Sequence, residues 1–245
     1  MPTLVSKSVE ADRAFEKKDI ATLGELATIN GNIQAIRHLR NFPKNNKATE
    51  YLTKIIQNDL YPFLKKEALY SLSFHINKSI ARTIILGQIS SEKTSLPIKL
   101  YIINFLTESG KKPTNKPHAE NLLITLLNDI NPSIRLESAI SLRELGNYKH
   151  SKTVFELLDE NYIVIRRKAV EEIIHYTKSA YISKIKELSN DTDPAIRGYA
   201  KKAITRYYKD RENRIASSQE TPVSYLASSK KLATYFSKNK TALVI

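Results

Sequence analysis

Apolar residues recur at three- and four-residue spacing along most of the chain, and short polar turns separate the apolar stretches. This is the period of helices that bury one face. Two such segments, TVFELLDE and YISKIKELSN, each run directly into a polar turn. The clearest stripe follows the last of these turns and consists of Ile196, Ala200, Ala203, Ile204 and Tyr207. The pattern therefore predicts pairs of amphipathic helices joined by tight corners.

Three of these predicted helix pairs are copies of one another. Residues 126–142, 157–173 and 187–204 align so that an arginine recurs every 31 residues. The arginine column consists of Arg135, Arg166 and Arg197, and the preceding turns carry the acidic residues Asp129, Glu160 and Asp191. A small residue follows each arginine three positions later, at Ser138, Ala169 and Ala200. A fixed period of this length predicts stacked helical repeats.

The polar turns carry signals for the start of a helix. Asp193 precedes Pro194, and Asn131 precedes Pro132. An Asp or Asn side chain caps the first free N–H groups of a helix, and proline suits the first helical position. We therefore predict that two of the second helices begin at Pro132 and Pro194.

Weaker copies of the repeat extend toward the N-terminus. Residues 96–106 align Lys99 with the arginine column, and residues 63–72 align Lys65 with it. The longer spacing between these copies is explained by inserted loops, of which 111–118 is the clearest. The sequence thus predicts an all-α fold of about six helix pairs within a repeat domain over 1–209, clearest over 121–209.

The corner pattern resembles a known repeat family. Asp-x-Asp-Pro-x-Ile-Arg-x-x-Ala is formed here by Asp191, Asp193, Pro194, Ile196, Arg197 and Ala200. It resembles the HEAT-repeat family, in particular the short type named for phycobilisome lyase subunits. The resemblance implies a right-handed α-solenoid whose second helices line a concave face. It also implies that the arginine column and the acidic residues Asp129, Asp191 and Asp193 form a structural ladder that pins each corner to its neighbour.

The chain changes character after Tyr208. Residues 210–222 are polar and predict a linker, whereas 223–245 regain a helical stripe followed by a lysine-rich tail. This C-terminal helix either caps the exposed core of the last repeat or acts as a detachable amphipathic peptide that binds a partner or an anionic membrane.

The chain has 245 residues, no cysteine and a formal net charge of +14. The lack of cysteine excludes disulfides, thiolate nucleophiles and cysteine-bound zinc. Because no apolar run is long enough for a signal peptide or a membrane span, we expect a cytoplasmic protein. The positive charge favours an acidic partner, either protein or nucleic acid, although it serves solubility equally well.

Few residues indicate catalysis. The six glycines form no nucleotide-binding loop, and the five histidines are dispersed, at His38, His75, His118, His150 and His175. We therefore expect no metal and no cofactor, and the sequence identifies no catalytic residue. The resemblance leaves two other functions open. One is a bilin-lyase-like chromophore transferase or chaperone subunit, which would bind a bilin; the other is a DNA glycosylase-like enzyme, which the absence of tryptophan disfavours.

Basic residues on adjacent second helices form the candidate binding patch. It consists of Arg167, Lys168, Lys201, Lys202 and Arg206. Such cations contact phosphates or carboxylates of a partner. Glu171 and Glu172 interrupt the patch, so a solvated surface of mixed charge is the alternative. The sequence as a whole favours a non-enzymatic scaffold that binds an acidic macromolecule on its concave face.

Overall fold

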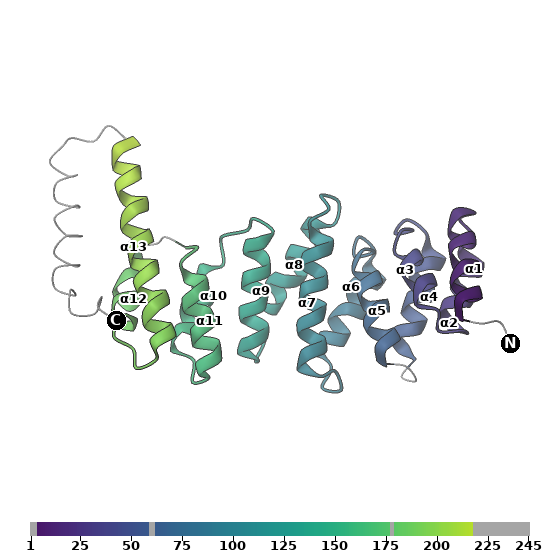
Figure 1. The fold of residues 1–245 in the computed structure, drawn as a ribbon, viewed down its shortest axis with the longest axis horizontal. Helices are drawn as coiled ribbons and strands as arrows, with labels where there is room; N and C mark the ends of the chain where they lie inside the picture. The colour runs from purple at the N-terminus through teal and green to yellow at the C-terminus, as the bar shows by residue number, and fades with distance from the viewer. Residues whose placement is uncertain (1–3, 59–61, 177–178, 218–245) are drawn as a thin grey trace. The chain divides into compact units, whose positions relative to one another are not determined.

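The computed structural model describes residues 4–58, 62–176 and 179–217, and the helix pattern predicted from the sequence is present in all three ranges. Thirteen α-helices and two 3₁₀ helices make up the regular structure of these residues (Figure 1). The chain divides into two compact units, residues 1–150 and residues 151–245. The boundary falls inside the stretch that the sequence predicts as one repeat domain.

The first unit contains helices α1 to α9 within its described residues. Their bounds are α1 (Leu4–Glu16), α2 (Ile20–Thr28), α3 (Ile33–Leu39), α4 (Asn46–Gln57), α5 (Pro62–Ser73), α6 (Ser79–Ser90), α7 (Leu96–Gly110), α8 (Lys116–Leu126) and α9 (Pro132–Glu144). The second unit contains α10 (Ser151–Glu156), η1 (Leu157–Asp159), α11 (Ile163–Ile173), η2 (Ser179–Tyr181), α12 (Ile182–Leu188) and α13 (Pro194–Ser217).

Consecutive helices pack as pairs. In the first unit these pairs are α2 with α3, α4 with α5, α6 with α7, and α8 with α9; in the second they are α10 with α11, and α12 with α13. The second helices also pack on one another, from α3 through α5 and α7 to α9, and α11 on α13, while α1 adds a further helix against α3. The all-α solenoid with about six helix pairs is thus confirmed. Its handedness and its concave face stay predictions.

The helix starts follow the capping residues that the sequence indicates. The side chain of Asn131 accepts a hydrogen bond from the Ser133 N–H at 2.9 Å, and α9 begins at Pro132. Asp193 accepts from the N–H groups of Ala195 and Ile196, both at 3.0 Å, and α13 begins at Pro194. These bonds satisfy donors that have no partner inside the helix.

The repeated apolar columns form the core of each unit. The small residues Ser138, Ala169 and Ala200 are fully buried, so neighbouring helices approach closely there. The larger residues seven positions after each arginine, Leu142, Ile173 and Ile204, are buried as well. Each fully buried Leu or Ile side chain contributes roughly 1.5–3 kcal/mol relative to exposure. The periodicity therefore predicted the buried face of these helices, except at the end of the last stripe, where Tyr208 is buried and Tyr207 is half-buried.

Each arginine of the column binds main-chain oxygens of its own corner. Arg135 Nη1 donates to the carbonyl oxygens of Asp129 and Ile130, both at 3.0 Å. Arg166 makes the same pair of bonds to Glu160 and Asn161 at 2.8 and 3.2 Å. Arg197 does so to Asp191 and Thr192 at 2.9 and 2.8 Å. These bonds lie within one corner, whereas the predicted ladder would join neighbouring corners.

The acidic turn residues stabilise the same corners with their carboxylates. Asp129 accepts a hydrogen bond from the Asn131 N–H, and Asp191 accepts one from the Asp193 N–H, both at 2.8 Å. Each carboxylate thus orders the turn locally, two residues ahead of itself, as Asp commonly does. The acidic residue offers its carboxylate to a main-chain donor and its own carbonyl to the arginine.

The long helix α13 corrects the predicted linker. It runs to Ser217, so 210–217 are helical, although the sequence suggests a linker from 210. The residues there are good helix formers, and an ion pair one turn apart adds support: Arg206 Nε lies 3.8 Å from Asp210 Oδ2. The rest of the predicted linker and the C-terminal segment 223–245 lie outside the described residues.

Candidate functional site

The predicted basic patch of the second unit does not form one face. Arg167 and Lys168 lie on α11, and Lys201, Lys202 and Arg206 lie on α13. Successive residues on an α-helix point about 100° apart, so the two adjacent pairs diverge. Four of the five residues are exposed, whereas Lys201 is half-buried. The five cations are therefore divided between two helices and do not share one face.

Arg167 is tied to the neighbouring repeat. Its Nε donates to Oδ2 of Asp193 at 3.0 Å, and Asp193 is the capping residue of α13. The hydrogen bond from Arg167 lowers the pKa of Asp193 to about 2, with help from the Ile196 N–H. The same bond raises the pKa of Arg167. This contact joins α11 to the next corner, which is the structural task that the resemblance implied for the arginine column.

Two other cations of the patch, Lys202 and Arg206, lie close to a ring or a carboxylate. Lys202 Nζ is 5.5 Å from the ring centroid of Tyr199, and the nearby Glu171 carboxylate raises the pKa of the Tyr199 phenol. Arg206 lies near Asp210, as described above. The patch is consequently a surface of mixed charge, the alternative that Glu171 indicated in the sequence.

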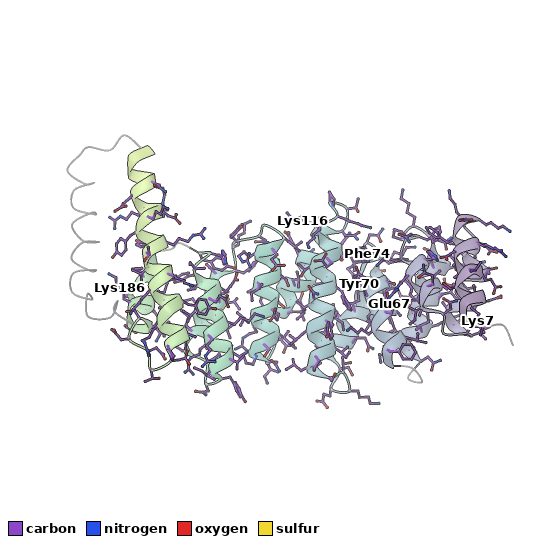
Figure 2. The ribbon with its side chains drawn as sticks, in the orientation of Figure 1. Lys7, Glu67, Tyr70, Phe74, Lys116 and Lys186 are labelled. Carbon is purple, nitrogen blue, oxygen red and sulfur yellow. The ribbon has the colours of Figure 1, made fainter. Side chains whose placement is uncertain are left out.

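A second group of cations lies on aromatic rings in the first unit, and the sequence analysis did not identify it. We call it the cation–aromatic strip. Along α5 and the turn that follows it, Glu67 is followed by two rings of the strip, Tyr70 and Phe74 (Figure 2). The strip consists of the rings of Tyr70, Phe74, Tyr101 and Phe105 and the cations Arg40, Lys66 and Lys112.

The four rings form a continuous row across α5 and α7. The centroid of Tyr70 is 5.3 Å from that of Phe74 and 4.8 Å from that of Phe105. Phe105 is in turn stacked on Tyr101 at 6.2 Å. These separations are typical of favourable aromatic pairs. Tyr101 keeps 44% of its surface exposed, and the other three rings are half-buried.

The cations lie along the whole length of this row. The Arg40 guanidinium is 5.2 Å from the centroid of Tyr70 and 5.4 Å from that of Phe74. Lys112 Nζ is 4.7 Å from the centroid of Phe74, and Lys66 Nζ is 3.5 Å from that of Tyr101. Cations over ring faces are attracted by the ring quadrupole. The strip thus combines positive charge with aromatic surface at the solvent boundary.

A groove lies at the N-terminal end of α3. Its volume is about 430 Å³, and Phe63, which is 60% exposed, forms part of its wall. Arg37, which also lines the groove, pairs with Glu67 of α5 at 3.2 Å. The lining residues are Lys7, Ser8, Asn30, Gly31, Asn32, Ile33, Gln34, Arg37 and Phe63.

One signal in the sequence could have located the strip. Lys66, Tyr70 and Phe74 follow one another at four-residue spacing, as do Tyr101 and Phe105. This spacing places each set on one face of a helix. Arg40 and Lys112 carry no such signal, because both lie in turns after their helices and meet the rings only when the helices stack.

One histidine, His75, lies inside the core of the first unit. Within the described ranges, no three His, Cys, Asp or Glu side chains gather where they could hold a metal ion. His75 is fully buried, and burial lowers its pKa to about 4. Its Nε2 donates to the Leu39 carbonyl at 3.2 Å, and Nδ1 therefore accepts from the Thr49 hydroxyl at 2.9 Å. His75 stabilises the fold as a neutral side chain.

The stacked helix pairs define a helical repeat protein. No family model and no curated protein matches the sequence. Among solved structures, the chain is similar to an engineered protein at 14% identity, covering 78% of this chain and 97% of that one with a TM-score of 0.43. A designed armadillo repeat protein in complex with the peptide (KR)4 is 15% identical, with 77% and 98% covered and a TM-score of 0.44. Human deoxyhypusine hydroxylase in complex with glycerol is 11% identical, with 81% and 98% covered and a TM-score of 0.33. Similarities this distant carry no argument about function.

None of the helices in the described ranges is long and apolar enough to cross a membrane.

Proposed function

We propose that this protein is a non-enzymatic repeat scaffold that binds an acidic macromolecular partner along its second helices. The cation–aromatic strip is the observation that carries the proposal. Repeat proteins of stacked helix pairs expose extended surfaces that suit large partners better than small substrates. In a HEAT-like arrangement, as the corner pattern suggests, the second helices would line the concave face.

The charge of both units supports an acidic partner. Residues 1–150 contain 21 Lys and Arg against 14 Asp and Glu, and residues 151–245 contain 18 against 11. Each unit therefore has a surplus of seven positive charges. A distributed surplus of this kind attracts polyanions over a distance and raises the rate of encounter. The strip adds a local surface on which such a partner can be held.

The two catalytic alternatives rest on the resemblance alone. A bilin-lyase-like subunit would share the short HEAT-like corners, and a DNA glycosylase-like enzyme would share the basic helix pairs. Neither is favoured by a particular contact among the described side chains. We therefore place both behind the scaffold.

A binding assay tests the scaffold directly. The purified full chain is titrated into labelled duplex DNA, single-stranded nucleic acid and a polyglutamate peptide across about 50 to 300 mM salt. We expect tight binding of at least one of these polyanions, and its affinity should fall steeply as salt rises. If the chain binds none of these polyanions at the lowest salt, its positive charge serves solubility and the proposal fails.

The two surfaces can be compared in the same assay. The pair Lys168→Gln and Lys202→Gln removes exposed cations of the second unit, and Lys66→Gln with Lys112→Gln removes cations of the strip. Because Lys202 lies beside one ring, whereas the strip cations accompany a row of four rings, we expect the strip pair to weaken polyanion binding more. Arg167 is left intact, since it holds two repeats together.

A further inference from the structure

We propose that the cation–aromatic strip binds single-stranded nucleic acid, with bases stacked on its rings and phosphates held by its cations. The inference rests on the proposed function and narrows it to one class of acidic partner. It is carried by the row of four rings across α5 and α7 together with the three cations that accompany it.

The combination of chemistries selects the ligand. An acidic peptide would contact the cations but would not require the row of rings. Duplex nucleic acid presents phosphates but keeps its bases stacked inside the helix. A single strand presents a phosphate and an accessible aromatic face at every nucleotide, and proteins hold such strands with aromatic platforms beside positive charge.

The order of groups along the strip matches such a polymer. Lys112 lies at the Phe74 end of the row, Arg40 lies over Phe74 and Tyr70, and Lys66 lies over Tyr101 at the other end. Positive charge is therefore present along the entire row of rings. A strand laid along the row would have a cation close to its phosphates at both ends of the row and at Tyr70.

The carboxylates of the same helices are held by other cations. Glu67 is paired with Arg37 at 3.2 Å, and Glu108 is paired with Lys111 at 2.5 Å. Neither Arg37 nor Lys111 belongs to the strip. Among the described residues no carboxylate forms an ion pair with Arg40, Lys66 or Lys112, so their positive charge is left for a ligand.

The exposed end of the strip suggests how a base would enter. Lys66 covers the ring of Tyr101, the most exposed ring of the row. Lysine carries its charge on a flexible four-carbon stem, so the ammonium group can move from the ring to a phosphate when a base takes its place. In the absence of a ligand, Lys66 covers the ring of Tyr101.

The test uses the full chain and two labelled single strands of about 15 nucleotides, oligouridine and oligothymidine. A duplex of the same length and polyglutamate serve as comparisons. Fluorescence anisotropy is measured across about 50 to 300 mM salt. We expect both single strands to bind more tightly than the duplex or the peptide. A preference between the two strands would report contacts to the ribose hydroxyl.

Two sets of variants separate stacking from charge. Tyr101→Ala should weaken single-strand binding by about tenfold, because each stacked base contributes on this scale, and should leave the salt slope unchanged. Tyr101→Phe keeps the ring and should restore the affinity. Lys66→Gln with Lys112→Gln should reduce the salt slope by about 1.4, since each phosphate contact to a single strand contributes about 0.7.

Matched controls lie elsewhere in the same unit. Tyr148→Ala removes another exposed tyrosine, and Lys93→Gln with Lys149→Gln removes two exposed lysines. These controls should bind as the unaltered chain does. Circular dichroism and the thermal transition confirm that each variant is folded.

The outcomes distinguish this inference from the broader proposal. If polyglutamate binds and single strands do not, the strip is not a nucleic-acid site and the scaffold proposal stands. If no polyanion binds, both proposals fail. Single-strand binding that Tyr101→Ala and the lysine pair leave unaltered would place the site elsewhere and overturn the inference.

Discussion

Arg167 of α11 donates a hydrogen bond to Asp193, and the same carboxylate caps the first turn of α13. One Asp193 oxygen accepts from Arg167 Nε at 3.0 Å, and the other accepts from the N–H groups of Ala195 and Ile196 at 3.0 Å. Asp193, which caps the start of α13, thus also joins that helix to the preceding repeat. Because Arg167 follows the column residue Arg166, neighbouring arginines on α11 bind two successive corners.

The two tasks of Asp193 can be separated by substitution. Asp193→Asn keeps an oxygen that caps α13 but loses the charged partner of Arg167, so we expect a small decrease in Tm. Asp193→Ala loses both contacts, and we expect a larger decrease. Thermal unfolding followed by circular dichroism measures both. Equal Tm values for the two variants would show that the cap contributes nothing.

The ion pair also predicts a dependence on acid pH. The pKa of Asp193 is lowered from 3.8 to about 2, so the folded chain binds this proton less readily than the unfolded chain. The carboxylate therefore stabilises the fold above pH 3.8, and this contribution is lost as pH falls toward 2. The Tm difference between the unaltered chain and Asp193→Asn should shrink over that range. A constant difference would contradict the assignment.

The arginine column should be essential for stability without taking part in binding. Arg197→Met keeps the aliphatic stem but leaves the carbonyls of Asp191 and Thr192 without their donor, and we expect a loss of roughly 1–3 kcal/mol in the free energy of unfolding. Arg206→Met, on an exposed turn of the same helix, is the control and should change stability by less than about 0.5 kcal/mol. Urea denaturation at neutral pH measures both variants, and similar losses would contradict a structural role for the column.

Two glycines in helices should respond to alanine in opposite ways. A Cβ at Gly24 of α2 would lie 2.1 Å from Cε2 of Tyr51, so Gly24→Ala should cost about 1–3 kcal/mol through overpacking. Gly87 of α6 has no atom within 4 Å of such a Cβ, so Gly87→Ala should stabilise the chain by about 0.5–1 kcal/mol through helix propensity. Denaturant midpoints give both values. Stabilisation of the Gly24 variant would show that α2 and α4 do not pack this closely.

The buried histidine predicts a second pH effect, at a less acidic pH. The pKa of His75 is lowered from 6.5 to about 4, so below pH 6.5 the unfolded chain gains a proton that the folded chain does not. Stability should therefore fall between pH 6.5 and 4, by up to about 3 kcal/mol, and be independent of this group above pH 6.5. A proton NMR titration of the imidazole measures the pKa. A value near 6.5 would show that the ring reaches solvent.

The basic patch and the strip show why candidate sites are harder to predict than helices. Arg167 has an obvious charge in the sequence, but its partner lies 26 residues away in the next corner. Arg40 has no neighbour in sequence that suggests an aromatic contact, yet it meets Tyr70 and Phe74 on the following repeat. Such contacts depend on how far one helix pair is rotated and shifted against the next.

The sequence by itself determined the repeat, the buried stripes, and the helix starts at Pro132 and Pro194, because periodicity and capping depend on residues within a turn or two of one another. The tertiary structure alone decided that Arg167 binds Asp193, that Arg37 pairs with Glu67, and that the rings of Tyr70 and Phe105 meet. Those outcomes depend on side chains from separate helices, about one repeat apart in the chain, and only the packing of one repeat on the next brings them into contact.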